Sequence, residues 1–242
     1  MSNDSGALPH RPATSKLLTE IAHTSLAEVA DGRFVRPASV DRNKIQKGGE
    51  FPPAAGRYHL YVSLACPWAH RTVIFRKLKG LEKAIGLSIV EPAWGPVVGE
   101  NDTKHWIFAQ EGEVRSVRCH YSPLAQLVDK VNHLQSLRAV YKFFNHDHQG
   151  KVTTPLLVDL VRMKPLPTAC TADYLKQTKR IVNNESSEIL VFFNSEFNEF
   201  AENPSLDLIP ADLKPKIEEI NNMIYNSAPL PFPLVTQLCS SE

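Results

Sequence analysis

Cys66 has the sequence context of a reactive thiol in this chain of 242 residues. It follows a run of strand-forming residues at 59–64, and it precedes Pro67 and a helical pattern over 69–79. A thiol at the start of a helix faces unpaired backbone N–H groups and the positive end of the helix dipole, which favour the nucleophilic thiolate. Ala69 stands where a Cys-x-x-Cys motif would have its second cysteine, so an external thiol must resolve any mixed disulfide. The alternative is that Cys66 is a small buried apolar residue.

Glu185 and Ser186 form a second candidate site. They follow an Asn-Asn turn and open a predicted helix, where free N–H groups and the helix dipole suit a carboxylate ligand. Ser186 can donate a hydroxyl, and Glu185 can accept from an ammonium. The alternative is that the pair forms an ordinary N-terminal cap of the helix.

Other polar and aromatic residues have simpler interpretations. The sequence His146-Asp147-His148 could suggest a metal, but no second ligand cluster flanks it, so we predict a solvated loop and no metal site. Trp94 and Trp106 fit packing roles. The basic residues of the helix at 69–79 are predicted to form a solvated face: Arg71, Arg76, Lys77 and Lys79. Three cysteines lack the context of Cys66: Cys119, Cys170 and Cys239.

The composition is that of an ordinary globular protein. With 27 Lys+Arg and 26 Asp+Glu, the formal charge of +1 gives no argument for binding nucleic acid or an acidic membrane surface. A content of 43% hydrophobic and 22% charged residues allows a buried core, and no apolar run approaches the ~20 residues of a membrane span. The separated cysteines and the absence of a secretory signal indicate a reducing compartment. We expect the cytoplasm, with a plastid as the alternative.

The hydrophobic pattern predicts alternating strands and helices. Strands are expected at 59–64, 85–90, 154–158 and 181–182. Helices are expected at 69–79, 134–144, 185–200 and 210–225. Residues 1–56 are expected to form an extended arm, and 92–135 a long irregular stretch that can contain further structure.

This order of elements, with a proline opening the third strand, is that of a thioredoxin-like domain. We therefore expect an α/β fold with a mixed four-stranded sheet over 57–203, followed at 204–242 by the start of an all-helical domain. By analogy with that fold, Pro155 would be cis, which would leave the backbone of Thr154 available to pair with an extended peptide ligand. The alternative is an ordinary proline at a strand edge.

Three segments resemble one known family, the Xi class of glutathione transferases, or glutathionyl-hydroquinone reductases. FPPAAGRYHLYVSLACPWAHR (51–71) and IVNNESSEI (181–189) resemble its glutathione-binding domain, and LDLIPADLKPKIEEINNMIYN (206–226) resembles the opening of its helical domain. The resemblance covers roughly 20–159 and 177–226, and it is loose over 93–135.

The resemblance implies a reaction in which glutathione is both part of the substrate and the reductant. Cys66 would attack the sulfur of a glutathionyl-hydroquinone, the hydroquinone would leave, and a second glutathione would resolve the Cys66–glutathione disulfide. Glu185 and Ser186 would hold the γ-glutamyl end of glutathione. The implied cofactor is glutathione as co-substrate, with no metal. The implied partners are glutathione and glutathionyl-hydroquinones, with neither nucleic acid nor membrane.

Further glutathione contacts follow from the same resemblance. Thr154, before Pro155, would give a backbone contact to the cysteinyl group, where the family usually has valine. Trp106, in a Trp-x-Phe context, would contact glutathione, and Arg138 would lie near its carboxylate.

Two stretches depart from the family pattern. Residues 160–176 intervene where the family has a short turn, so we expect an insert from an unspliced or alternative exon. One predicted helix follows residue 204, and the tail at 227–242 is unlike the family. We therefore expect a shortened helical domain that lacks most of the hydroquinone pocket and of the interface through which the family typically forms homodimers.

Three functions remain open on this basis. The first is a glutathionyl-hydroquinone reductase whose activity is impaired in this form of the chain. The second is a glutaredoxin-like monothiol transferase, which would remove glutathione from small disulfides without a second substrate pocket. The third is a non-catalytic splice product that folds poorly or serves as a binding partner.

Overall fold

The fold is taken from a computed structural model, which describes residues 28–30, 33–35, 39–92, 94–96, 104–109, 127–148, 151–160 and 180–227. The chain divides into two compact units, Met1–Pro37 and Ala38–Glu242. Some predicted features lie outside the described residues: the start of the arm, nearly all of 160–176, the tail from 228, and Cys119, Cys170 and Cys239.

The first unit contains a strand pair that the sequence analysis did not predict. Strand β1 (Glu28–Ala30) pairs antiparallel with β2 (Arg33–Val35), and Val29 lies opposite Phe34. Strands of three residues are too short to show the alternation of polar and apolar residues from which strands are predicted.

The second unit is built on a mixed four-stranded sheet, as predicted, with strand order β4-β3-β7-β8. Strand β3 (Tyr58–Ser63) pairs in parallel with β4 (Ile85–Val90) and antiparallel with β7 (Leu156–Asp159). Strand β8 (Arg180–Asn183) pairs antiparallel with β7 at the edge. The element order and this pairing are those of a thioredoxin-like domain, which confirms the predicted fold class.

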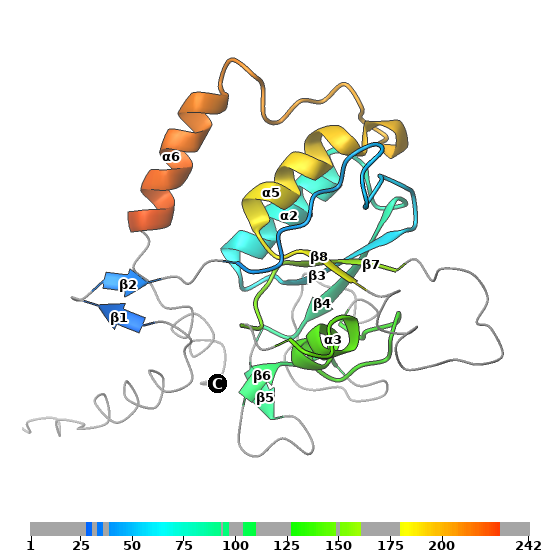
Figure 1. The fold of residues 1–242 in the computed structure, drawn as a ribbon, viewed down its shortest axis with the longest axis vertical. Coiled ribbons are helices and arrows are strands. Elements are labelled where there is room, and N and C mark those ends of the chain that lie inside the picture. Colours follow the sequence, from blue (N-terminus) through cyan, green and yellow to red (C-terminus); the bar gives the residue numbers. More distant parts are fainter. Residues whose placement is uncertain are drawn as a thin grey trace, which may run out of the picture. The chain divides into compact units, whose positions relative to one another are not determined.

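Helices cover both faces of this sheet. Helices α2 (Pro67–Leu78) and α5 (Ser186–Val191) lie on one face, and α3 (Leu137–Phe144) lies on the other (Figure 1). Successive residues of a strand point to opposite faces, so neighbouring residues of β3 belong to two separate cores. The core under α2 and α5 includes Leu60, Val62, Ala69, Ile189 and Phe193. The core under α3 includes Tyr61, Val140, Tyr141, Leu156 and Val158.

The helix predicted over 185–200 is α-helical only in its first part. After α5 the chain widens into a π-helix at Phe192–Glu196 and tightens into a 3₁₀-helix at Asn198–Phe200. The Ser195 hydroxyl donates to the Val191 carbonyl at 3.1 Å, a local bond that competes with regular helix pairing. The apolar pattern alone could not reveal this change in winding.

Two short strands lie within the stretch that was predicted to be irregular. Strand β5 (Trp94–Pro96) pairs antiparallel with β6 (Lys104–Trp106). The chain then continues to Ile107, which forms a bridge to Ser136, the residue before α3. The pairing attaches β6 to the start of α3.

Helix α6 (Lys214–Ser227) confirms the helix predicted at 210–225. Several of its apolar side chains are exposed: Ile220, Met223 and Ile224. Among the described residues, no helix is both long enough and apolar enough to cross a membrane.

The prediction of a solvated basic face on α2 is wrong for most of its residues. Arg76 is buried, and its guanidinium donates to the carbonyls of Ile85 at 2.8 Å and Glu82 at 3.1 Å. Lys79 is also buried, and its ammonium donates to Asn198 Oδ1 at 2.7 Å, Leu206 O at 2.7 Å and Pro204 O at 3.3 Å. Lys77 is exposed and pairs with the Glu82 carboxylate. Buried carbonyls need donors, and long basic side chains can supply them.

The part of the predicted arm that follows Pro37 packs within the second unit. Ile45 and Phe51 are buried in the core under α2 and α5. Residues 39–45, which we call the edge segment, run beside β8: Arg42 forms an antiparallel bridge to Asn183, among other bonds. The edge segment thereby covers a sheet edge that would otherwise expose backbone groups.

Candidate functional site

Cys66 lies at the junction of strand and helix that the sequence predicts. It is the N-cap residue of α2, with Pro67 at the first helical position, and its carbonyl accepts from the backbone N–H of His70 at 2.8 Å. The side chain is 8% exposed, and its thiol donates to the carbonyl of Thr154 at 3.5 Å. Cys66 therefore stands at the start of a twelve-residue helix, with its thiol in contact with the segment that contains Thr154.

Thr154 reaches the thiol because of the order of strands in the sheet. It precedes β7, which pairs with β3, and β3 leads directly into the Cys66 turn. The bond from Thr154 to Pro155 is cis, as predicted. Two segments 88 positions apart in the sequence therefore meet at one end of the sheet, with the Cys66 thiol on one and the backbone carbonyl of Thr154 on the other.

Glu185 combines the two roles that the sequence left open, a helix cap and a carboxylate with spare acceptor capacity. It is the N-cap residue of α5, and its Oε1 accepts from the Ser187 backbone N–H at 3.2 Å and from the Ser187 hydroxyl at 3.0 Å. Its Oε2 accepts from the Ser39 hydroxyl at 3.0 Å. An ionised carboxylate has about four acceptor positions, so these bonds leave room for a ligand donor.

Ser186 is paired with a cation that the sequence analysis had assigned to a solvated face. Its hydroxyl is buried and accepts from Arg71 Nη2 at 2.5 Å and Nε at 3.2 Å. The Arg71 guanidinium also lies over the ring of Trp68, 5.0 Å from its centroid. This arrangement ties α2 to the start of α5 and places a positive charge on Ser186, the residue that follows Glu185.

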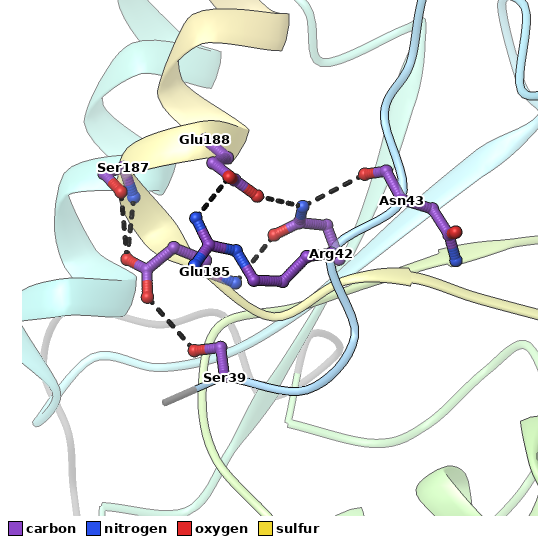
Figure 2. Close-up of polar contacts among 7 residues, drawn as sticks. Ser39, Arg42, Asn43, Glu185, Ser187 and Glu188 are labelled. Carbon is purple, nitrogen blue, oxygen red and sulfur yellow. Dashed lines mark hydrogen bonds and ion pairs between the residues drawn. The ribbon is translucent and has the colours of Figure 1, made fainter. Parts of the chain in front are cut away.

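The edge segment fixes the turn that carries these residues (Figure 2). Asn183 is fully buried; its Oδ1 accepts from the Glu185 N–H at 2.7 Å, and its Nδ2 donates to Asn43 O at 3.0 Å and to Glu188 Oε2 at 2.8 Å. Arg42 forms an ion pair with Glu188. Burial would raise the pKa of Glu188, but the bonds from Arg42 and Asn183 outweigh it and hold this pKa below its usual value.

Trp106 and Arg138 lie on the α3 side of the sheet. Trp106 is the last residue of β6; it is buried and packs edge-to-face against Trp94, with the ring centroids 5.6 Å apart. Arg138 is in the first turn of α3 and is half-buried. Because β6 adjoins the start of α3, these two residues come from neighbouring elements. Their contact with glutathione stays a prediction.

The histidine-rich loop after α3 is exposed at His146 and Asp147, as predicted. His148 instead packs on the buried ring of Tyr141, with the centroids 4.5 Å apart. Within the described ranges, no three His, Cys, Asp or Glu side chains gather in a way that could hold a metal ion.

The sequence analysis missed Ser39, Arg42, Asn183 and Arg71. Ser39 and Arg42 contact residues 146 positions away, so no local pattern could have identified them. For Arg71 a signal existed: it lies four residues after Pro67 on the helix that Cys66 opens. Together, Glu185 and the Arg71–Ser186 pair offer an acceptor for an ammonium and donors for a carboxylate, the two groups of an amino-acid terminus.

Comparisons with known proteins show the family of the chain. A family model of the glutathione S-transferase N-terminal domain matches residues 65–196, more than half of the chain. Among curated proteins, a glutathionyl-hydroquinone reductase, PcpF of Sphingobium chlorophenolicum, is 37% identical over 196 residues, which are 81% of this chain and 50% of PcpF. YqjG of Escherichia coli, another glutathionyl-hydroquinone reductase, is 35% identical over 204 residues, 81% of this chain and 52% of YqjG.

A solved structure of a glutathione transferase is also similar to this chain. The crystal structure of the Xi glutathione S-transferase of Phanerochaete chrysosporium superposes with a TM-score of 0.61 at 39% identity, covering 80% of this chain and 55% of that one. The chain thus spans about half the length of the relatives that it matches. From the matched domain, the strand order and the cysteine at the start of α2, the chain belongs to the glutathione S-transferase family, and within it is similar to the Xi class.

Proposed function

We propose that the chain reduces glutathionyl-hydroquinones to hydroquinones with glutathione as the reductant. The observation that carries this proposal is the Cys66 thiol at the N-cap of α2, 3.5 Å from the backbone carbonyl of Thr154. The names of the relatives PcpF and YqjG support the choice of substrate. With Ala69 in place of a second cysteine, the site needs a separate thiol to complete each cycle.

In the first step, the Cys66 thiolate attacks the sulfur that joins glutathione to the aromatic ring. A bond forms between Cys66 Sγ and the glutathione sulfur, and the carbon–sulfur bond breaks with its electron pair going to the ring carbon. That carbon takes a proton, and free hydroquinone leaves. The two sulfurs have become a disulfide, so the ring carbon has been reduced and the sulfurs oxidised.

In the second step, the thiolate of another glutathione attacks the mixed disulfide. Oxidised glutathione leaves, and the Cys66 thiolate is restored. The sum is one glutathionyl-hydroquinone and one glutathione converted to one hydroquinone and one oxidised glutathione, so no other reductant enters.

The polar groups around Cys66 suit glutathione in both steps. Glu185 would accept from the ammonium of the γ-glutamyl end, and Ser186 with Arg71 would hold its carboxylate, since Glu185 is an acceptor and the adjacent Ser186 binds the Arg71 guanidinium. The backbone of Thr154 would bind the cysteinyl part, which brings the glutathione sulfur to the thiol.

The test is the release of hydroquinone from a glutathionyl-hydroquinone in the presence of glutathione. Cys66→Ser should reduce turnover to the uncatalysed background, because serine cannot form the mixed disulfide. Cys119→Ser is the matched control and should keep the wild-type rate. Mass spectrometry of the wild-type protein with substrate alone should find glutathione attached to Cys66.

A different outcome would select another function. Turnover that survives Cys66→Ser would contradict the proposal. If the folded wild-type chain leaves glutathionyl-hydroquinones intact but removes glutathione from a glutathionylated peptide, it is a monothiol transferase. That reaction needs only Cys66 and the glutathione-binding residues.

A further inference from the structure

Tyr141 connects the two segments that would hold glutathione. It lies on α3 and is fully buried. Its hydroxyl donates to the carbonyl of Thr153 at 3.0 Å, and it accepts from Asn184 Nδ2 at 3.3 Å. Thr153 immediately precedes the Thr154–Pro155 pair, and Asn184 immediately precedes the Glu185–Ser186 pair. The Tyr141 hydroxyl therefore contacts the residue that precedes each binding segment: the backbone of Thr153 and the side chain of Asn184.

The hydroxyl is held in a defined state by its surroundings. Burial raises the pKa of Tyr141 to about 12, so the hydroxyl stays protonated at neutral pH and can donate to Thr153 while accepting from Asn184. Asn184 is also held from its other side, because its backbone N–H donates to the carbonyl of Asp41 at 3.0 Å and its Nδ2 lies 3.4 Å from Asp41 Oδ2. The contact thus joins Thr153 to a residue that is itself held by the edge segment.

The two segments would bind different parts of one ligand. In the proposed function, the backbone at Thr154 meets the cysteinyl part of glutathione, and Glu185 with Ser186 meets the γ-glutamyl part. A ligand that spans both segments binds best when their separation is fixed in advance, because the cost of ordering them is then not subtracted from the binding free energy.

We propose that Tyr141 is a positioning residue for glutathione, and that its hydroxyl sets the separation between the cysteinyl-binding and γ-glutamyl-binding segments. This inference rests on the proposed function, since it assumes that glutathione occupies both segments. The ring of Tyr141 also fills the core under α3, so the experiment must separate the hydroxyl from the ring.

Tyr141→Phe removes the hydroxyl and keeps the ring. We expect KM for glutathione to rise about three- to tenfold, which corresponds to one hydrogen bond, with kcat changed less. Tyr58→Phe is the matched control: Tyr58 is also fully buried, and its hydroxyl donates to a backbone carbonyl, that of Pro52 at 2.8 Å, away from both binding segments. We expect Tyr58→Phe to leave KM for glutathione unchanged.

A second thiol distinguishes a role of Tyr141 in positioning glutathione from a general loss of order in the protein. Cysteinylglycine lacks the γ-glutamyl group and cannot span the two segments. As the resolving thiol it should react with wild type and Tyr141→Phe at the same KM. An equal rise in KM for both thiols, or an equal rise in Tyr141→Phe and Tyr58→Phe, would overturn the proposal.

The partner of the hydroxyl gives an independent variant. Asn184→Ala removes the other end of the contact and should also raise KM for glutathione, and the double variant with Tyr141→Phe should add little to either single change. Full additivity would contradict a shared contact.

Measuring glutathione binding by calorimetry distinguishes failure of the Tyr141 proposal from failure of the proposed function. If wild type binds glutathione more tightly than Tyr141→Phe but does not release hydroquinone, the positioning role stands and the proposed function fails. If wild type does not bind glutathione, the positioning role fails as well.

Discussion

Opposite charges meet around one short segment at the start of α5. Glu185 presents a carboxylate, and the next residue, Ser186, holds the guanidinium of Arg71. In an exposed surface pair, a carboxylate and a guanidinium bond to each other at a gain of about 0–1 kcal/mol. Here each is anchored to a different partner, the carboxylate to Ser187 and Ser39 and the guanidinium to Ser186. Both therefore keep capacity for a zwitterionic ligand.

The buried His59 makes the free energy of unfolding depend on pH. It is buried, and its Nε2 lies 2.9 Å from Ser88 Oγ. Burial, helped by the charge of Arg76, lowers the pKa of His59 to about 4. An unfolded histidine has a pKa of about 6.5, so between these values the unfolded state binds the proton that the folded state rejects. The contribution of His59 is full above pH 6.5 and is lost as the pH falls toward 4.

The measurement is the free energy of unfolding from pH 7 to pH 5. His59 alone should account for a loss of about 2 kcal/mol over this interval. His59→Gln should remove that part of the pH dependence, whereas His70→Gln, which changes an exposed histidine of α2, should leave it in place. A pH profile that is the same in wild type and His59→Gln would show that the buried ring does not carry the effect.

At the scale of elements, the edge segment completes the sheet. Strand β8 ends in Asn183, and the edge segment supplies the neighbour that its backbone and the Asn183 amide require. The amide bonds reach three places: the Asn43 carbonyl, the Glu188 carboxylate and the Glu185 N–H. This one side chain thus holds the turn on which Glu185 and Ser186 lie.

Asn183→Ala should destabilise the protein by about 2–4 kcal/mol, because it leaves several buried or half-buried polar groups without their bonds. Asn203→Ala is the control, since the Asn203 amide makes an exposed bond to the carbonyl of Leu78 at 2.8 Å and its loss should cost under about 1 kcal/mol. Denaturant unfolding of both variants gives the comparison. Equal small losses would mean that the edge segment binds β8 without help from Asn183.

The elements that could be predicted are those with a local signal. The strand predicted at 85–90 has the same first and last residues as β4, because its apolar run is bounded on both sides. The junction at Cys66 and the cis bond at Pro155 followed from the order of elements. Contacts such as Ser39 with Glu185 could not be predicted, because they join residues 146 positions apart and depend on the folded sheet rather than on any repeat in the sequence.

At the scale of the second unit, the end of α2 is joined to the segment that follows the helices of residues 186–200. Lys79 is fully buried, although sequence patterns place lysine on the surface. Its ammonium donates to Asn198 Oδ1 in the last of those helices and to two backbone carbonyls of the later segment, Pro204 O and Leu206 O. The backbone adds a further link, because Asn203 N–H donates to the carbonyl of Lys79 at 3.1 Å. A cation in this position replaces the water that these oxygens would otherwise need.

Lys79→Met tests whether this link supports the whole second unit. Methionine keeps the length of the side chain and its apolar stem but leaves three oxygens without a donor, so we expect a loss of about 2–4 kcal/mol in the free energy of unfolding. Lys83→Met, which removes an exposed lysine paired with Glu202, should change the free energy of unfolding far less than Lys79→Met. Lys79 and Cys66 lie at opposite ends of α2. We therefore expect the activity per folded molecule to stay at the wild-type level. A large loss of turnover with little loss of stability would instead mean that the C-terminal end of α2 affects the reactivity of Cys66 at the start of the helix.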